Sequence, residues 1–74
     1  MTEPTIDELE RTILERLAEC GECTPAEIAL ALDADLDRVY EGITRLRERD
    51  LLERVGFDTC MLTDDGHAAL SAAD

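Results

Sequence analysis

The 74-residue sequence contains no lysine: its seven basic residues are all arginines, against 19 acidic residues, and its formal net charge is -12. Strong acidity is common in disordered chains, but 45% of these residues are hydrophobic and they recur periodically, unlike in disordered acidic segments. We therefore expect a folded protein of a halophilic type. In molar salt, carboxylates hold water and cations, and screening limits charge repulsion to about 3 Å.

The sequence also lacks long apolar runs. No stretch approaches the roughly 20 apolar residues that cross a membrane. The opening residues, Met-Thr-Glu-Pro-Thr, have neither the basic start nor the apolar run of a signal peptide. We expect a cytoplasmic protein without membrane association, in which Cys20, Cys23 and Cys60 are thiols rather than a disulfide framework.

Catalytic motifs are missing as well. The sequence has no Gly-rich phosphate loop and no Ser/His/Asp set. A chain of this length buries only about 60–65% of its unfolded surface, which leaves little room for a preorganised catalytic pocket. We expect no enzyme and no cofactor.

What is present is a regular spacing of apolar residues, which predicts three helices. The first carries one apolar stripe and ends at Gly21; the stripe consists of Ile6, Leu9, Ile13 and Leu17, with Leu14 and Ala18 beside it. The second begins at a capping box formed by Thr24 and Glu27, with Pro25 in the first helical position. Its inward residues are Ile28, Ala29 and Leu32.

The third helix follows the interruption at Asp33-Ala34-Asp35, where Asp35 is the expected cap. It ends near Asp50, and its expected buried residues are Leu36, Val39, Ile43 and Leu46. Gly42 lies inside this helix at a cost of about 1 kcal/mol relative to alanine. Two explanations stay open for it: a close approach to a neighbouring element, or crowding against one.

After residue 50 the apolar period changes. Residues 51–55 and 59–62 are predicted strands joined by a tight turn at 56–58. Thr63 caps a last short helix that continues through Leu70. The order helix, helix, helix, strand, strand, helix predicts a mainly α fold with a small β-hairpin. We expect one domain over residues 6–74, after a disordered lead over residues 1–5.

Three stretches are informative together: Ile28-Ala29 with Leu32, Val39 to Leu46 continuing into Leu51-Leu52-Glu53-Arg54, and Met61-Leu62-Thr63-Asp64-Asp65-Gly66. In this order they resemble the winged helix-turn-helix superfamily, and most of all its MarR-like and small archaeal phage-repressor-like regulators. The resemblance covers roughly residues 6–70 and implies that the hairpin is the wing. Asp33 and Asp50 stand where this family often has glycine; aspartate tolerates left-handed backbone better than most residues.

The resemblance implies a transcriptional regulator whose third helix enters the major groove of double-stranded DNA. On that helix, the candidate DNA-binding residues are Arg38, Tyr40, Thr44 and Arg45, and Arg54 joins them from the first wing strand. Arginine reads guanine edges or phosphate, and the hydroxyls of Tyr and Thr bond phosphate. A homodimer through the terminal helices, or through exposed Leu30, would present two such helices.

Two features favour an alternative, a protein-interaction module that keeps the fold and has lost DNA binding. Asp37 and Glu41 share the face of the candidate residues, and the wing turn holds Asp58 but no basic residue. An acidic third helix suits a basic protein partner. The arginines of residues 45–49 are open to two interpretations, phosphate contact or a solvated helix end that opposes the helix dipole.

The cysteines allow a further alternative, a thiol or zinc sensor on the same scaffold. Cys20 and Cys23 have CxxC spacing, and Cys60 and His67 would have to complete a zinc site. The resemblance implies that the segment around Cys23 pairs with the strand that holds Cys60. Because free cysteine is among the most buried residue types, we expect all three to be core residues, with no metal site.

Overall fold

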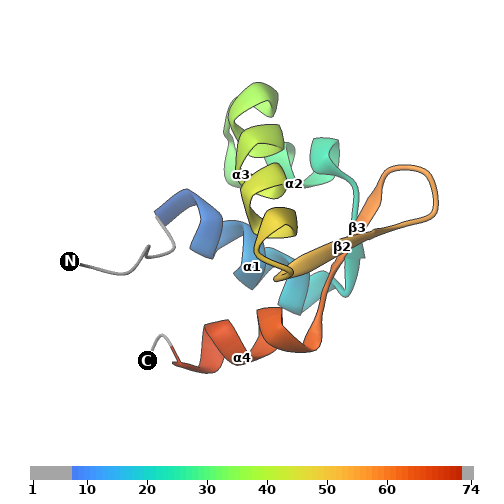
Figure 1. The fold of residues 1–74 in the computed structure, drawn as a ribbon. Helices are drawn as coiled ribbons and strands as arrows, with labels where there is room; N and C mark the ends of the chain where they lie inside the picture. The colour runs from blue at the N-terminus through green and yellow to red at the C-terminus, as the bar shows by residue number, and fades with distance from the viewer. Residues whose placement is uncertain (1–7, 73–74) are drawn as a thin grey trace.

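The computed structural model describes residues 8–72 (Figure 1). Its elements are α1 (Glu8–Cys20), β1 (Glu22–Cys23), α2 (Pro25–Leu32), α3 (Leu36–Glu48), β2 (Leu52–Val55), β3 (Thr59–Leu62) and α4 (Asp64–Ala72). This order confirms the predicted mainly α fold with a β-hairpin. The predicted lead of residues 1–5 and the apolar residue Ile6 lie outside the described residues. Within residues 8–72, no helix has the length and apolar character needed to cross a membrane.

α1 lies at the centre of the molecule, between α3 and α4, and the β2–β3 hairpin projects away from the helices (Figure 1). The three strands form one antiparallel sheet in the order β1-β3-β2. Cys23 is the register partner of Cys60, as predicted. The first turn of α1 and the last turn of α4 lie at the end of the molecule opposite the hairpin.

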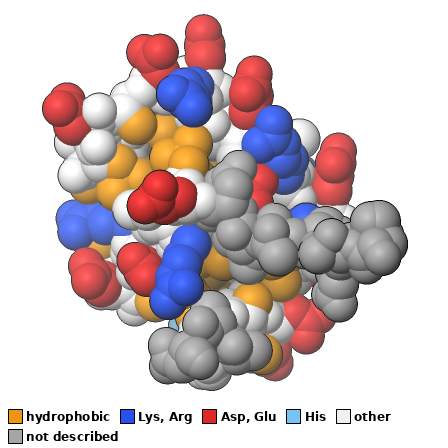
Figure 2. Space-filling model, turned by 90° about the vertical axis from the view of Figure 1, so that its left-hand side faces the viewer, with side chains coloured by type: hydrophobic (Ala, Val, Ile, Leu, Met, Phe, Trp, Pro, Cys, Tyr) orange, Lys and Arg blue, Asp and Glu red, His pale blue; other side chains and the backbone are white. Residues whose placement is uncertain are grey.

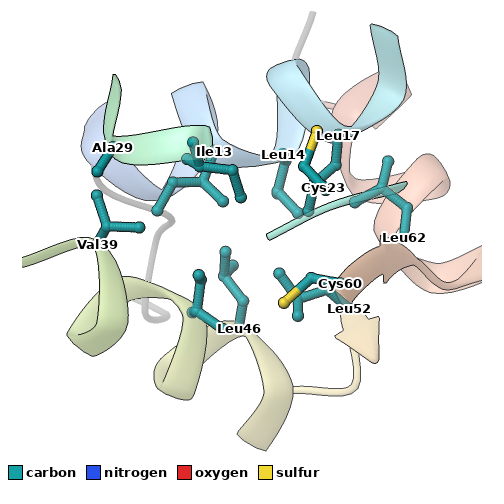
Figure 3. Packing of buried hydrophobic residues seen from close by; sticks show 12 residues of the cluster. Ile13, Leu14, Leu17, Cys23, Ala29, Val39, Leu46, Leu52, Cys60 and Leu62 are labelled. Atoms are coloured by element: carbon teal, nitrogen blue, oxygen red, sulfur yellow. The ribbon is translucent and has the colours of Figure 1, made fainter. Parts of the chain in front are cut away.

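The core lies where α1, α2, α3 and the sheet meet (Figure 3). Its residues are all aliphatic or cysteine: Ile13, Leu14, Leu17, Cys23, Ile28, Ala29, Val39, Ile43, Leu46, Leu52, Cys60 and Leu62. Leu36 was predicted to be buried but is 42% exposed, and Ala18, beside the predicted stripe of α1, is also exposed. Leu36 is the first residue of α3 and lies at the outer edge of its apolar stripe, and Ala18 lies a quarter turn beyond Leu17.

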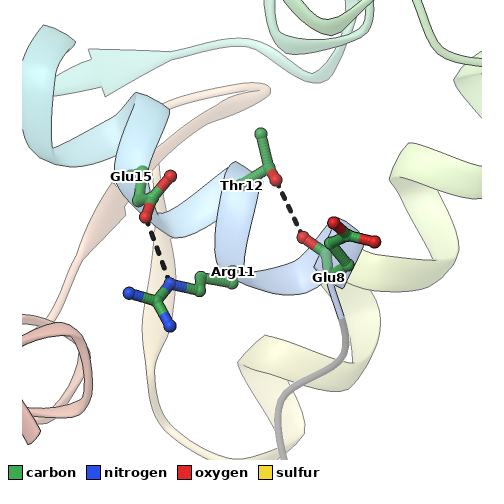
Figure 4. Close-up of polar contacts among 4 residues, drawn as sticks. All are labelled: Glu8, Arg11, Thr12 and Glu15. Atoms are coloured by element: carbon green, nitrogen blue, oxygen red, sulfur yellow. Dashed lines mark hydrogen bonds and ion pairs between the residues drawn. The ribbon is translucent and has the colours of Figure 1, made fainter. Parts of the chain in front are cut away.

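α1 is held locally by bonds between neighbouring turns (Figure 4). The Thr12 hydroxyl donates to the carbonyl of Glu8 at 2.8 Å, and the Arg11 guanidinium pairs with Glu15 at 3.2 Å. Exposed pairs four residues apart contribute only about 0.3–0.5 kcal/mol. The helix is therefore stabilised mainly by the packing of its buried face.

α2 begins with the predicted capping box. The backbone N–H of Glu27 donates to the Thr24 hydroxyl at 3.2 Å, and the N–H of Thr24 donates to the Glu27 carboxylate at 2.9 Å. The helix ends at Asp33, whose φ of 55° is left-handed. Asp35 occupies the N-cap position of α3, but its side chain makes no capping bond, so its predicted capping role was wrong.

The Leu-Thr-Asp-Asp-Gly sequence connects α4 to the loop before β2. The Thr63 hydroxyl accepts from the N–H of Gly66 at 3.0 Å and donates to the carbonyl of Asp50 at 2.6 Å. Asp50 has a φ of 62°, so aspartate adopts left-handed backbone at both positions where the family often has glycine. A Cβ on Gly66 would overlap the carbonyl oxygen of Leu51. Only glycine lets the first turn of α4 come this close to that loop.

Candidate nucleic-acid interface

α3 buries one side and exposes the opposite side. Its buried residues are Val39, Gly42, Ile43 and Leu46. At 100° per residue, the stripe that projects farthest from the core lies opposite them. This outer stripe consists of Asp37, Glu41, Thr44 and Glu48, all of which are exposed. We call it the acidic ridge, because three of its four side chains are carboxylates.

Arg38 and Arg45 lie on the flank of α3 that faces α1. They are seven residues apart, two helical turns, and together line a hollow of about 390 Å³ with Glu8, Leu9 and Glu41. The structure thus brings together two of the predicted DNA-binding residues. Their cations lie beside carboxylates from both helices, so this flank has a mixed charge.

Arg45 forms an ion pair with a buried carboxylate. Its guanidinium lies 3.5 Å from the carboxylate of Glu10, whose side chain is only 5% exposed, whereas the Arg45 side chain is 56% exposed. Gly42 faces α1 beside this pair: a Cβ there would lie 2.9 Å from Cδ1 of Ile13 and 3.9 Å from Cγ of Glu10. This contact is compatible with both explanations for Gly42, close approach and crowding, and does not decide between them.

The burial of Glu10 was not predicted. The signal was its place in the helix, because Glu10 is three and four residues before Ile13 and Leu14 and lies in the middle of the buried stripe of α1. A buried carboxylate requires a partner. Arg45 supplies one from 35 positions further along the chain.

The opposite flank of α3 faces the hairpin. Tyr40, on this flank, is 42% exposed, and Arg54 is exposed on β2. Burial raises the pKa of the Cys60 thiol, and so does nearby Asp58, while the charges of Arg47 and Arg54 act in the opposite direction. Both arginines therefore lie near Cys60, and Arg47 is a basic residue that was not among the predicted DNA-binding residues.

The tip of the hairpin carries an aromatic side chain. Phe57 is 95% exposed and follows Gly56, whose φ of 67° makes the turn. With Tyr40 it completes the aromatic residues of the chain, and neither belongs to the core. Tyr40 lies on α3, and Phe57 lies in the turn between β2 and β3.

The surface shows no broad basic region on the face drawn in Figure 2. Its arginines alternate with Asp and Glu side chains around an apolar area. This mixed pattern fits the charge of the chain as a whole. Approach to a polyanion in dilute buffer would be opposed by the long-range field, which molar salt removes.

The cysteines do not all occupy core positions as predicted. Cys23 and Cys60 are buried, whereas Cys20 is exposed. Among residues 8–72, no group of three or more His, Cys, Asp or Glu side chains is gathered as a metal site. The zinc alternative therefore has no ligand set in this part of the chain.

Comparison with known proteins gives relatives of two kinds, and no family model matches the chain. The α subunit of phenylalanine–tRNA ligase from Methanopyrus kandleri is 46% identical over 48 residues, which are 65% of this chain and 9% of that protein. BpsR from Bordetella bronchiseptica superimposes with a TM-score of 0.88 at 24% identity, over 97% of this chain and 55% of BpsR.

A MarR mutant from E. coli, solved in complex with operator DNA, superimposes with a TM-score of 0.85 at 22% identity over 90% of this chain and 52% of that protein. The chain has the winged helix-turn-helix fold, with β2–β3 as the wing. Within that fold, its arrangement of helices and strands is similar to those of BpsR and MarR. It spans about half the length of these solved proteins and less than a tenth of the ligase subunit.

Proposed function

We propose that this chain is a transcriptional regulator that binds double-stranded DNA through α3. The observation that carries the proposal is the likeness of nearly the whole chain to a MarR mutant complexed with operator DNA. The exposed, 13-residue α3 has the length and position of a helix that enters the major groove.

The position of each side chain on α3 and the wing determines which part of the DNA it would contact. Thr44, the uncharged member of the acidic ridge, would approach the bases, and Arg38 would reach a guanine edge from one flank. Tyr40 would contact phosphate from the other flank. Arg54 would contact phosphate from the wing. Arg45 takes part only when the pair with Glu10 opens or tolerates a second partner. The three ridge carboxylates restrict this function to conditions in which cations screen or bridge them.

High salt is part of the proposal. A charge of -12 repels DNA over about 10 Å at 0.1 M salt but over only about 3 Å at 1 M. The usual gain from counterion release is small in molar salt. Binding there rests on hydrogen bonds and shape, which arginine, threonine and tyrosine provide. We further propose a cytoplasmic homodimer, since two copies of α3 would read two half-sites one helical turn apart.

The test is selection from a pool of random duplex DNA at 2 M KCl, about the regime in which the field is screened. We expect an enriched sequence and a Kd for it that worsens at least 10-fold in Arg38→Ala. Arg11→Ala is the matched control, because Arg11 pairs with Glu15 on α1, away from α3. Recovery of no duplex above background would refute the proposal. The same binding experiment is also carried out with tRNA, because the relative from Methanopyrus is a tRNA ligase subunit.

A second function is favoured by the acidic ridge: docking of a basic protein segment. Carboxylates at Asp37, Glu41 and Glu48 suit arginine side chains, and exposed Tyr40 adds an aromatic face for a cation. The double variant Asp37→Asn/Glu41→Gln separates the two functions. Under the DNA proposal it raises duplex affinity, because two like charges leave the groove. Under the docking alternative it weakens binding of an arginine-rich peptide and leaves DNA binding absent.

A further inference from the structure

Two thiols meet where α1 joins β1. α1 ends at Cys20, and the N–H of Gly21 donates to the carbonyl of Leu17 at 2.7 Å. Gly21 then reverses the chain with a φ of 87°, a conformation that favours glycine. This turn brings Cys23 back beside the end of the helix, where its thiol is a neighbour of the Cys20 thiol.

The two thiols differ in access. Cys20 is exposed, whereas Cys23 is 5% exposed. Both line a solvent-open hollow of about 460 Å³. The other residues that line it are Arg16, Glu22, Glu27, Leu30 and Ala31. A small molecule that enters this hollow meets Cys20 first, with Cys23 directly behind it.

Cys60 is a neighbour of this pair but not a member of it. It is the register partner of Cys23 across β1 and β3. In Figure 3, however, the sulfur of Cys23 lies beside Leu17 on the α1 side, whereas the sulfur of Cys60 lies on the opposite side, towards α3. Cys60 therefore provides a matched buried thiol in the same sheet.

We propose that Cys20 and Cys23 form a redox-active dithiol, which a low-molecular-weight disulfide oxidises to an intramolecular disulfide. The Cys20 thiolate attacks one sulfur of the oxidant, so that a mixed disulfide forms and one small thiol leaves. Cys23 then loses its proton and attacks the Cys20 sulfur, which releases the second small thiol. The pair gives up two electrons and two protons, and the oxidant is reduced to two thiols.

The environment sets the order of these steps. Burial, followed by the hydrogen bond with Cys20, raises the pKa of Cys23 to about 11, so this thiol stays protonated at neutral pH. Since the thiolate is the nucleophile, the exposed Cys20 attacks first and Cys23 resolves the mixed disulfide. The CxxC loop is short, so the second step needs only a local movement of the turn at Gly21. The site stands on these residues alone and does not depend on DNA binding.

In the experiment, the reduced protein is incubated with oxidised glutathione, and the remaining thiols are alkylated under denaturing conditions. The mass of the product is then measured by mass spectrometry. Three cysteines are present, and we expect one to remain alkylatable in the oxidised wild type, with no bound glutathione. Peptide mapping should place the disulfide between Cys20 and Cys23. The control Cys60→Ala should lose both of its remaining thiols at the same rate.

The variants identify each role. Cys23→Ala should stop at a glutathione adduct on Cys20, and Cys20→Ser, which changes an exposed residue, should leave Cys23 unreacted in the folded protein. The proposal is wrong if the wild type stops at the adduct, if Cys60 enters the disulfide, or if two chains become linked through Cys20. Because Cys20→Ser alters the surface alone, it keeps the test decisive even if Cys23→Ala fails to fold.

Discussion

Replacement of Gly66 by alanine tests how α4 is attached to the domain. Gly66 is the third residue of α4, and its N–H donates to the Thr63 hydroxyl. A Cβ at this position would overlap the carbonyl oxygen of Leu51 and would lie 3.2 Å from a Leu62 methyl group. The carbonyl oxygen is backbone, and it already accepts the N–H of Thr63 at 3.2 Å, so it cannot turn away freely.

The magnitude follows from the kind of contact. Overpacking that shifts backbone costs about 1–3 kcal/mol, and the gain in helix propensity from Gly to Ala, up to about 1 kcal/mol, is small in a first turn. We expect a net loss near 2 kcal/mol. For a domain of this size, that corresponds to a fall in Tm of roughly 8–16 °C.

The assay is thermal and urea unfolding followed by circular dichroism at constant salt. Gly42→Ala is the matched control, because the Cβ there meets the end of the Ile13 side chain at 2.9 Å, which can move, and the propensity gain of about 1 kcal/mol offsets the contact. We expect its stability to stay within about 1 kcal/mol of the wild type. Equal losses in both variants, or an unchanged Gly66→Ala, would refute the reasoning.

Three further predictions concern charge, backbone and pH. Glu10→Gln should lower the free energy of unfolding by only about 1 kcal/mol, because its half-exposed partner Arg45 stays hydrated. The same change should strengthen duplex binding by releasing the Arg45 cation, as titration calorimetry would measure, and weaker binding would contradict this. Asp50→Ala, at a φ of 62°, should cost about 1 kcal/mol in urea unfolding while Asp50→Gly should not; similar values for both would argue against strain there. The pKa of Cys23 is raised from 9.0 to about 11, so the stability it contributes is complete below pH 9 and is lost as pH rises towards 11. In the presence of a reductant, Cys23→Ala should flatten this alkaline fall, and an unchanged slope would contradict the assignment.

Features with a local cause were predictable from the sequence. The capping box at Thr24 and Glu27, the stop at Gly21 and the change of period after residue 50 each depend on residues within one turn of one another. The structure has all three where they were expected. The left-handed backbone at Asp33 agrees with the family resemblance, in which this turn often carries glycine.

Features that depend on distant partners could not be predicted. The choice of Arg45 as the partner of Glu10 and the need for glycine at position 66, which arises from the carbonyl of Leu51, both depend on residues far away in the sequence. Neither partner is identified by a spacing pattern. The candidate DNA-binding residues were predicted as a set, but their division into an α1 flank, a hairpin flank and an acidic ridge follows from how α3 is rotated against α1.

The most direct test of the account is the affinity of the selected duplex for three proteins: wild type, Arg38→Ala and Asp37→Asn/Glu41→Gln. It is measured at about 2 M KCl, where the long-range repulsion between protein and DNA is screened. If α3 lies in the major groove, loss of the Arg38 contact weakens binding about 10- to 100-fold, and removal of the two ridge charges strengthens it. If both variants bind the duplex as the wild type does, α3 is not the DNA-binding element and the central claim is wrong.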